Sequence, residues 1–193
     1  MNYLAHAFLS PPDDAVLLGN MACDMIRPSD AESLPEGIRN GMALHHAIDR
    51  SADSHGAFRE IRSLLHRRHL PYAGVLLDVI LDHYLARYWQ DYAEISLQDF
   101  SSRVYDVLSV SIKDQLIPGH FNRLASALIT NDWFGSYASM KGLSLALGRL
   151  NYRSSREIPV SLIMETVNLE YERIRLSFIE LMNSLTGSYG HIQ

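Results

Sequence analysis

The chain has 193 residues, 47% of them hydrophobic, which is enough for the core of one globular domain. Lysine and arginine (17) against aspartate and glutamate (22) give a formal net charge of −5, which gives no support to a general nucleic-acid binder. The single cysteine, Cys23, cannot form an internal disulfide, so stability must come from packing. A reducing, cytoplasmic compartment is therefore expected.

The apolar segments are too short to cross a membrane or to serve as a secretion signal. The first residues lack a basic region, and their apolar run is short. The longest apolar runs, 75–77 and 79–81, are interrupted by Asp78 and Asp82. We expect a soluble protein with no membrane segment.

Apolar residues recur with a helical period along almost the whole chain, and alternating runs with hairpin turns are absent. Pro11-Pro12 ends a first short segment, and Asp13-Asp14 offers N-caps for the next helix. The pattern predicts an all-α helical bundle in a single domain, residues 1–193. The helices expected before the last one cover residues 15–26, 37–52, 54–68, 71–92, 96–114, 120–130 and 132–149.

Turn-forming residues predict where the helices are interrupted. The segment 28–35, bounded by prolines, is interpreted as a loop or mobile lid, and Asn40-Gly41 as a helix entry. Ser96 begins a sequence similar to a capping box. Pro159 is expected in the first turn of one long final helix that ends near Gly187.

Histidines and acidic residues recur in pairs that are one helical turn apart. His45 and Asp49 are separated by four positions, as are Asp78 and Asp82, and His83 follows directly. Residues four apart lie on one face of a helix, so two such helices can direct imidazoles and carboxylates into one small volume. Because these nitrogen and oxygen ligands suit a divalent ion that activates water, the spacing predicts metal-assisted hydrolysis.

Several of these carboxylates interrupt apolar surroundings. Asp24 follows a run of apolar and small residues, and Asp78 and Asp82 break an apolar stripe. Burying an ionised carboxylate costs several kcal/mol unless a cation or strong donors lie nearby. The alternative is that each group is structural, with Asp49 paired to a neighbouring arginine. The recurrence of the groups in pairs favours the metal.

The ligand types favour Mn²⁺, Mg²⁺ or Fe²⁺ over a structural zinc ion, because no thiolate accompanies them. Cys23 points elsewhere on its helix than Asp24 and is more typical of a core residue. At most one of His45 and His46 is expected to bind the ion, since neighbours on a helix point about 100° apart. The sequence contains no His-Glu-x-x-His, Gly-x-Ser-x-Gly or P-loop motif.

A local excess of positive charge lies between the two candidate ligand segments. The segment 59–69 contains a single acidic residue and four arginines, which are Arg59, Arg62, Arg67 and Arg68. Such a segment could steer an acidic partner or a phosphate toward the site, and guanidinium groups suit phosphate oxygens well. The alternative is a solvated helix face.

Five motifs span most of the chain: Asn2-x-Leu4-Ala5-His6, Leu18-Gly19-Asn20-x3-Asp24, Gly41-x-x-Leu44-His45-x-x-Ile48-Asp49-x3-Asp53-x-His55, Asp78-x3-Asp82-His83-x-Leu85-Ala86-x2-Trp89 and Asn131-Asp132-Trp133-x3-Tyr137. Together they resemble the motifs of the acyl carrier protein phosphodiesterases. The chain departs from the family pattern at His46 (usually Arg), Ser51-Ala52 (usually Phe-Thr) and Gly56 (commonly Pro). These changes border the site, so they bear on the acyl-chain or carrier preference more than on the chemistry.

The resemblance implies an all-helical, HD-phosphohydrolase-like fold. It also implies hydrolysis of the phosphodiester that links 4′-phosphopantetheine to a serine of holo-acyl carrier protein, with Mn²⁺ as the usual metal. Carrier proteins are strongly acidic helical bundles, which would give the basic segment 59–69 a partner.

We assign provisional roles on this basis. The residues expected to hold one or two divalent ions are Asp24, His45, Asp82 and His83. Their neighbours one turn away, expected as further ligands or as orienting groups, are Asp49 and Asp78. Those expected to position water or protonate the leaving oxygen are His6, Asp53 and His55. Two alternatives stay open: an HD-type hydrolase of a nucleotide or other small phosphate ester, and a helical interaction protein without enzymatic activity.

Overall fold

The computed structural model describes residues 3–67, 73–117, 120–151 and 157–190. Within these ranges all regular structure is helical, as predicted, and no strand occurs. Two 3-10 helices, η1 (Cys23–Met25) and η2 (Trp89–Asp91), follow α2 and α6. The α-helices in chain order are α1 (Tyr3–Phe8), α2 (Asp14–Ala22), α3 (Pro28–Ala31), α4 (Glu36–Ser54), α5 (Gly56–Arg67), α6 (Ala73–Arg87), α7 (Leu97–Asp114), α8 (Phe121–Thr130), α9 (Trp133–Tyr137), α10 (Met140–Leu150), α11 (Val160–Leu169) and α12 (Tyr171–Tyr189).

Side-chain caps begin two helices where the sequence predicts them. Asp13 accepts hydrogen bonds from the amides of Ala15 and Val16 at 2.9 and 3.0 Å, so it caps α2. Ser96 Oγ accepts one from the Asp99 amide at 3.0 Å and caps α7. Both predicted caps are confirmed.

Two predicted interruptions are wrong. The segment 28–35 is not only a loop, because Pro28 occupies the first turn of the short helix α3, where a proline costs no hydrogen bond. Asn40-Gly41 is not a helix entry, because α4 already begins at Glu36 and includes both residues.

The predicted helices 15–26 and 71–92 end early, with η1 and η2 in place of their last turns, and two more predicted helices are each divided. The segment 132–149 forms α9 and α10, because Ser139 Oγ accepts a hydrogen bond from the Gly142 amide at 3.0 Å and starts a new helix. The long final helix is divided at Glu170, which ends α11 and begins α12 without a change in apolar period. The predicted start at Pro71 lies outside the described residues.

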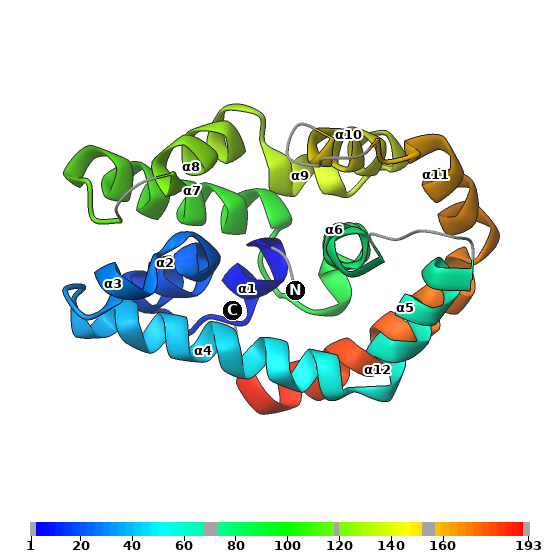
Figure 1. Ribbon diagram of the computed structural model, residues 1–193, viewed down its shortest axis with the longest axis horizontal. Coiled ribbons are helices and arrows are strands. Elements are labelled where there is room, and N and C mark those ends of the chain that lie inside the picture. The colour runs from blue at the N-terminus through cyan, green and yellow to red at the C-terminus, as the bar shows by residue number, and fades with distance from the viewer. Residues whose placement is uncertain (1–2, 68–72, 118–119, 152–156, 191–193) are drawn as a thin grey trace.

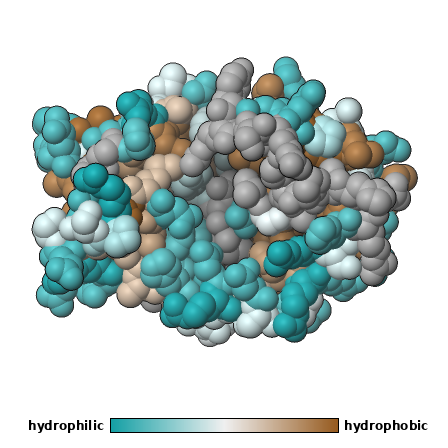
Figure 2. Space-filling view, in the orientation of Figure 1, coloured by the Kyte–Doolittle hydropathy of each residue, from teal (hydrophilic) through white to brown (hydrophobic). Residues whose placement is uncertain are grey.

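The buried apolar side chains form one cluster that extends from Leu4 in α1 to Leu185 in α12. Helix α1 lies in the middle of the molecule, packed against α2 and α6 (Figure 1). Hydrophilic side chains predominate along the lower edge of the face in Figure 2, where α4 runs in Figure 1. None of the described helices combines the length and the apolar character that a membrane crossing requires.

A pair of glycines lets α2 and α4 approach each other closely. A Cβ atom on Gly19 would lie 2.0 Å from the carbonyl oxygen of Ile38, and one on Gly41 would lie 2.2 Å from that of Val16. No larger residue fits at either position unless the helices separate. This close approach places Asn20, the residue after Gly19, beside α4.

Candidate metal centre

Two histidines from distant parts of the chain stack at the centre of the candidate site. The rings of His6 in α1 and His45 in α4 lie 4.0 Å apart at 12°, and both side chains are buried. The two oxygens of Asp49, one turn after His45, lie 3.3 Å from His6 Nε2 and 3.2 Å from His45 Nε2. One carboxylate therefore faces both imidazoles.

The buried side chain and backbone of Asn20 fix the tautomer of both rings. His45 Nδ1 lies 2.7 Å from the Asn20 carbonyl oxygen, which can only accept, so Nδ1 carries the proton. The Asn20 amide nitrogen donates to the His6 carbonyl and to Ser10 Oγ, both at 2.9 Å. Its Oδ1, at 2.8 Å, must therefore accept from His6 Nδ1. When the imidazoles are neutral, each Nε2 then presents a lone pair. On His45 a bound cation must replace the Nε2 proton that the neighbouring carboxylates favour.

Those two Nε2 atoms are buried and have no hydrogen-bond partner in the described part of the chain. Their short distances to Asp49 lack hydrogen-bond geometry, so neither ring axis points directly at a carboxylate oxygen. One ligand atom each from His6, His45 and Asp49 can be chosen within 4.8 Å of one another. Two imidazole lone pairs and a carboxylate that converge in this way fit a shared divalent cation.

Asp24 in η1 adds a second carboxylate on the solvent side. Its Oδ1 lies 3.3 Å from His45 Nε2, while its side chain is 81% exposed. The side chain of Asp49 is 34% exposed, and those of the two histidines 3% and 5%. We call these four residues the histidine–aspartate cluster. The gradient of exposure shows that the cluster is reached from the Asp24 side.

The pKa values of the cluster reflect burial and mutual charge. Burial lowers the pKa of His6 to about 4. Burial alone would also lower that of His45, but the carboxylates of Asp24 and Asp49 outweigh it and raise the pKa to about 9. Contact with His45 lowers the pKa of Asp24. Burial would raise the pKa of Asp49, but both histidines hold it below its usual value. Both carboxylates are therefore ionised at neutral pH.

Asp82 and His83, here called the α6 pair, form their hydrogen bonds with residues outside the cluster. The fully buried Asp82 accepts hydrogen bonds from the amides of Leu4 and Ala5 at 3.0 Å, so it caps the start of α1. His83 Nδ1 donates to the Tyr137 carbonyl at 2.7 Å. Its Nε2, at 3.2 Å from the Tyr171 hydroxyl, then accepts from that group. Every polar atom of this pair has a protein partner.

The remaining predicted residues occupy different surroundings. Asp78 is half-buried on α6, and burial raises its pKa, with the charges of Asp49 and Asp24 adding to the effect. Asp53 is exposed at the end of α4. His55 follows it and accepts a hydrogen bond from the Ala57 amide at 3.2 Å, which joins α4 to α5. No described contact places Asp53 or His55 against the cluster.

Arg59 and Arg62 are exposed on one face of α5. Glu60 is bound by Arg173 of α12 at 2.9 Å, so its charge is already compensated. The described ion pairs include neither Arg59 nor Arg62. The side chain of Arg67 and the whole of Arg68 lie outside the described part of the structure.

His46 points away from the cluster, with its ring at 86° to that of His45. Its Nε2 lies 3.6 Å from the buried Cys23 Sγ. Burial raises the pKa of this thiol to about 11, so Cys23 stays protonated. The thiol is therefore a packed core group.

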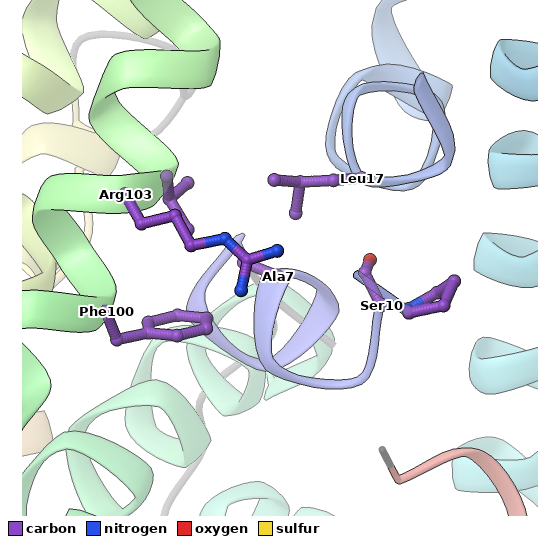
Figure 3. A pocket seen from close by; sticks show the side chains of 7 residues that line it. Ala7, Ser10, Leu17, Phe100 and Arg103 are labelled. Atoms are coloured by element: carbon purple, nitrogen blue, oxygen red, sulfur yellow. The ribbon is translucent and has the colours of Figure 1, made fainter. Parts of the chain in front are cut away.

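A small cleft lies on another side of α1, between α2 and α7 (Figure 3). Figure 3 shows the Arg103 guanidinium reaching across it toward α1, with Phe100 and Leu17 on its walls. None of its lining residues belongs to the cluster. We assign the cleft no part in the chemistry.

Sequence reasoning did not give Asn20 a role, although this residue holds both imidazoles. The available signal is a single amide side chain within the apolar run 17–23, directly after a glycine. A buried amide needs several hydrogen-bond partners, so its position in such a run indicates a polar network.

The described residues thus define an all-helical protein with a candidate metal centre of two histidines and two carboxylates. The family model described as acyl carrier protein phosphodiesterase matches residues 1–185, so the chain belongs to that family. It is 27% identical over 179 residues to the acyl carrier protein phosphodiesterase of Serratia proteamaculans, with 92% of each chain covered. It is 26% identical over 192 residues to that of Shigella boydii, covering 99% and 98%. No solved structure matches the chain.

Proposed function

We propose that this chain is a metal-dependent phosphodiesterase that releases 4′-phosphopantetheine from holo-acyl carrier protein. Its family and the names of its relatives support the phosphodiesterase activity and the carrier protein substrate. The observation that carries the metal dependence is the pair of buried Nε2 atoms that lie beside Asp49 without a hydrogen bond. An HD-type relationship and a cytoplasmic location belong to the same proposal.

We assign the metal to the histidine–aspartate cluster. His6, His45 and Asp49 would be the inner ligands, and Asp24 would close the solvent side. Nitrogen and carboxylate oxygen ligands without thiolate suit Mn²⁺, with Mg²⁺ or Fe²⁺ as alternatives. A bound divalent ion lowers the pKa of water and neutralises charge on phosphoryl oxygens.

The α6 pair has a supporting role in this proposal. Asp82 fixes the amides at the start of α1, which orients the helix that carries His6. His83 joins α6 to α9 through the Tyr137 carbonyl. Because all their polar atoms are already used, neither residue is needed as a ligand. The Nε2 atoms of the cluster have no hydrogen-bond partner, whereas each polar side-chain atom of the α6 pair has one.

The residues of the chain position the reacting groups around the metal site. Asn20 holds both rings through their Nδ1 atoms, so that each Nε2 lies beside Asp49. Each oxygen of Asp49 contacts the Nε2 atom of one ring, so both Nε2 atoms lie at about the same distance from the carboxylate. The exposed side of Asp24 leaves room for a protein-borne phosphodiester, which must approach from solvent. Hydrolysis at the serine side then yields apo-carrier protein and 4′-phosphopantetheine.

Arg59 and Arg62 are the residues we propose for docking the carrier. Both are exposed and positive, on a helix that begins directly after α4, which carries His45 and Asp49. An acidic helical partner is attracted to such a surface, chiefly through a faster association rate. Arg67 and Arg68 extend the same charge in the sequence.

The experiment is to incubate the protein with holo-carrier and Mn²⁺, and to weigh the carrier by mass spectrometry. We expect the carrier to lose the mass of phosphopantetheine, and a chelator to prevent the loss. A matched reaction with the His45→Ala variant should leave holo-carrier unchanged. Turnover that persists after exhaustive chelation would contradict the metal, and hydrolysis of nucleotides alone would contradict the carrier.

A further inference from the structure

A second polar group lies at the other end of α1 from His6. The indole of Trp133, the first residue of α9, lies 6.5 Å from the ring of Tyr3. The guanidinium carbon of Arg149, at the end of α10, lies 4.7 Å from the centre of the Trp133 ring. Tyr3 is three residues before His6 and so lies about one turn away on the same helix.

Two hydrogen-bond donors in this group are buried without an acceptor. They are Trp133 Nε1 and Arg149 Nη1, here called the donor pair, and the described part of the structure gives neither a partner. Among the described residues Arg149 has no carboxylate partner, whereas Arg27 and Arg173 each pair with one. Arg175 pairs with Glu172, although its Nε has no partner. Buried donors without acceptors are rare because each costs about 1–3 kcal/mol. Because the two donors belong to a stacked indole–guanidinium pair, a single acceptor from outside the chain would satisfy both.

The helix that carries Trp133 is held firmly in place. Asp132 before it has a φ of 40°, a conformation that an aspartate adopts at a cost. Its carboxylate accepts hydrogen bonds from the Gly135 amide at 3.2 Å and the Tyr105 hydroxyl at 2.9 Å. The same hydroxyl accepts one from the Phe134 amide at 3.1 Å. These bonds fix the direction in which α9 begins, and with it the position of the indole.

The separation from the cluster suits one part of the proposed substrate. Three residues of α1 rise about 4.5 Å. Added to the 6.5 Å between the Tyr3 and Trp133 rings, this rise gives a path of about 11 Å from His6 to the indole. In an extended pantetheine chain, the amide carbonyl nearer the thiol is about nine bonds from phosphorus. Nine bonds equal three residues of extended backbone, or about 10 Å.

We propose that Trp133 and Arg149 bind an amide carbonyl oxygen of the pantetheine chain while the phosphodiester lies at the histidine–aspartate cluster. This inference rests on the proposed function and adds the residues that recognise the arm. A carbonyl oxygen has two lone pairs, so one oxygen can accept from both donors. The pair thus distinguishes a pantetheine ester from a simple phosphodiester.

Two conservative variants remove the donors and keep the packing. Trp133→Phe keeps an aromatic ring under Arg149 and deletes the N–H, and Arg149→Met keeps the aliphatic stem. Matched controls are Trp89→Phe, whose N–H already donates to the Ile95 carbonyl at 2.8 Å, and Arg175→Met, whose guanidinium covers Tyr88. The controls reproduce the chemical change away from the proposed arm site.

The activity test compares holo-carrier with bis(4-nitrophenyl) phosphate, both with Mn²⁺. For holo-carrier we expect kcat/KM to fall about three- to tenfold in Trp133→Phe and about ten- to hundredfold in Arg149→Met. The aryl ester, which has no amide, should be hydrolysed at the wild-type rate by both variants. Equal loss on both substrates, or no loss on holo-carrier, would overturn the inference.

A binding test separates this inference from the reaction itself. Calorimetry with pantetheine should show weaker binding to both variants than to the wild type or the controls. If the wild type fails to hydrolyse holo-carrier, the proposed function fails, and the pantetheine affinities still decide on the donor pair. Unchanged pantetheine affinity with lost affinity for inorganic phosphate would make the pair an anion site and overturn the proposal.

Discussion

The histidine–aspartate cluster and the α6 pair contain the same kinds of residue, yet the fold uses them in opposite ways. In the cluster, the Nε2 atoms of His6 and His45 each lie within 3.3 Å of Asp49 but form no hydrogen bond. In the α6 pair, Asp82 accepts from two backbone amides, and both nitrogens of His83 have partners. Spacing alone does not distinguish the two sets. Nitrogens without a hydrogen-bond partner do, because a buried polar atom otherwise has one.

We expect the largest effect when the cluster loses the imidazole of His45. We expect His45→Ala to lower Mn²⁺ affinity and phosphopantetheine release by at least about 100-fold, because losses in outer-shell residues already reach that size. Calorimetry with Mn²⁺ and mass spectrometry of the carrier measure the two effects.

His83→Ala is the matched variant in the α6 pair. It removes an imidazole of equal burial, so the unfolding free energy should fall by about 2 kcal/mol, since the Tyr137 carbonyl loses its donor. Its Mn²⁺ affinity should stay within about twofold of the wild type. The reverse result, with binding lost only in His83→Ala, would move the metal to α6.

The next effect concerns the residue that orients the rings. Asn20→Ala removes the acceptor of His6 Nδ1 and both donated bonds but keeps every proposed ligand. We expect about 10- to 100-fold weaker Mn²⁺ binding in a competition assay with a fluorescent chelator. Ser10→Ala is the control, because Ser10 bonds Asn20 and the His6 carbonyl without touching an imidazole. Equal losses in the two variants would indicate a general packing defect.

Local sequence rules predict most of the helices, because caps and periodicity act over a few residues. Asp13 and Ser96 cap helices where expected. The failures arise where packing decides. The apolar period continues across Glu170, so nothing local shows that the chain bends there. Asn40-Gly41 resembles a turn in sequence, yet Gly41 serves the contact with α2.

The site is predictable only where its members share an element. The four-residue spacing of His45 and Asp49 places them on one face of α4, and their atoms lie 3.2 Å apart. That His6 from α1 joins them depends on how α1 and α4 pack, which no spacing encodes. For the same reason, Asp82 repeats the four-residue spacing with Asp78 but bonds to α1, and His83 beside it bonds to α9.

A smaller effect tests the close helix contact that places Asn20. Gly19→Ala would put a methyl group 2.0 Å from the Ile38 carbonyl, so α2 and α4 must separate. We expect the unfolding free energy to fall by about 1–3 kcal/mol, measured by urea unfolding. Gly148→Ala is the matched control, because its Cβ meets nothing within 4 Å and alanine favours a helix. An unchanged unfolding free energy in Gly19→Ala would show that α2 and α4 can separate at little cost.

The smallest effect is the pH dependence that Asp82 contributes. Burial raises its pKa to about 7, although the amides of Leu4 and Ala5 lower it. In the unfolded chain the pKa is about 3.9, so between these values the folded state holds a proton that the unfolded state has released. Stability from this group is therefore highest below about pH 4 and falls as the pH rises toward 7.

Asp82→Asn isolates this contribution, because the amide does not titrate. Its cost in unfolding free energy, relative to the wild type, should shrink by about 1–2 kcal/mol between pH 5 and pH 7, measured by urea unfolding at each pH. Other titrating groups cancel in the difference. A cost that stays constant or grows would mean that two amide donors already keep Asp82 ionised at pH 5. The carboxylate would then cap α1 in its charged form, just as the carboxylates of the cluster are charged where they contact the histidines.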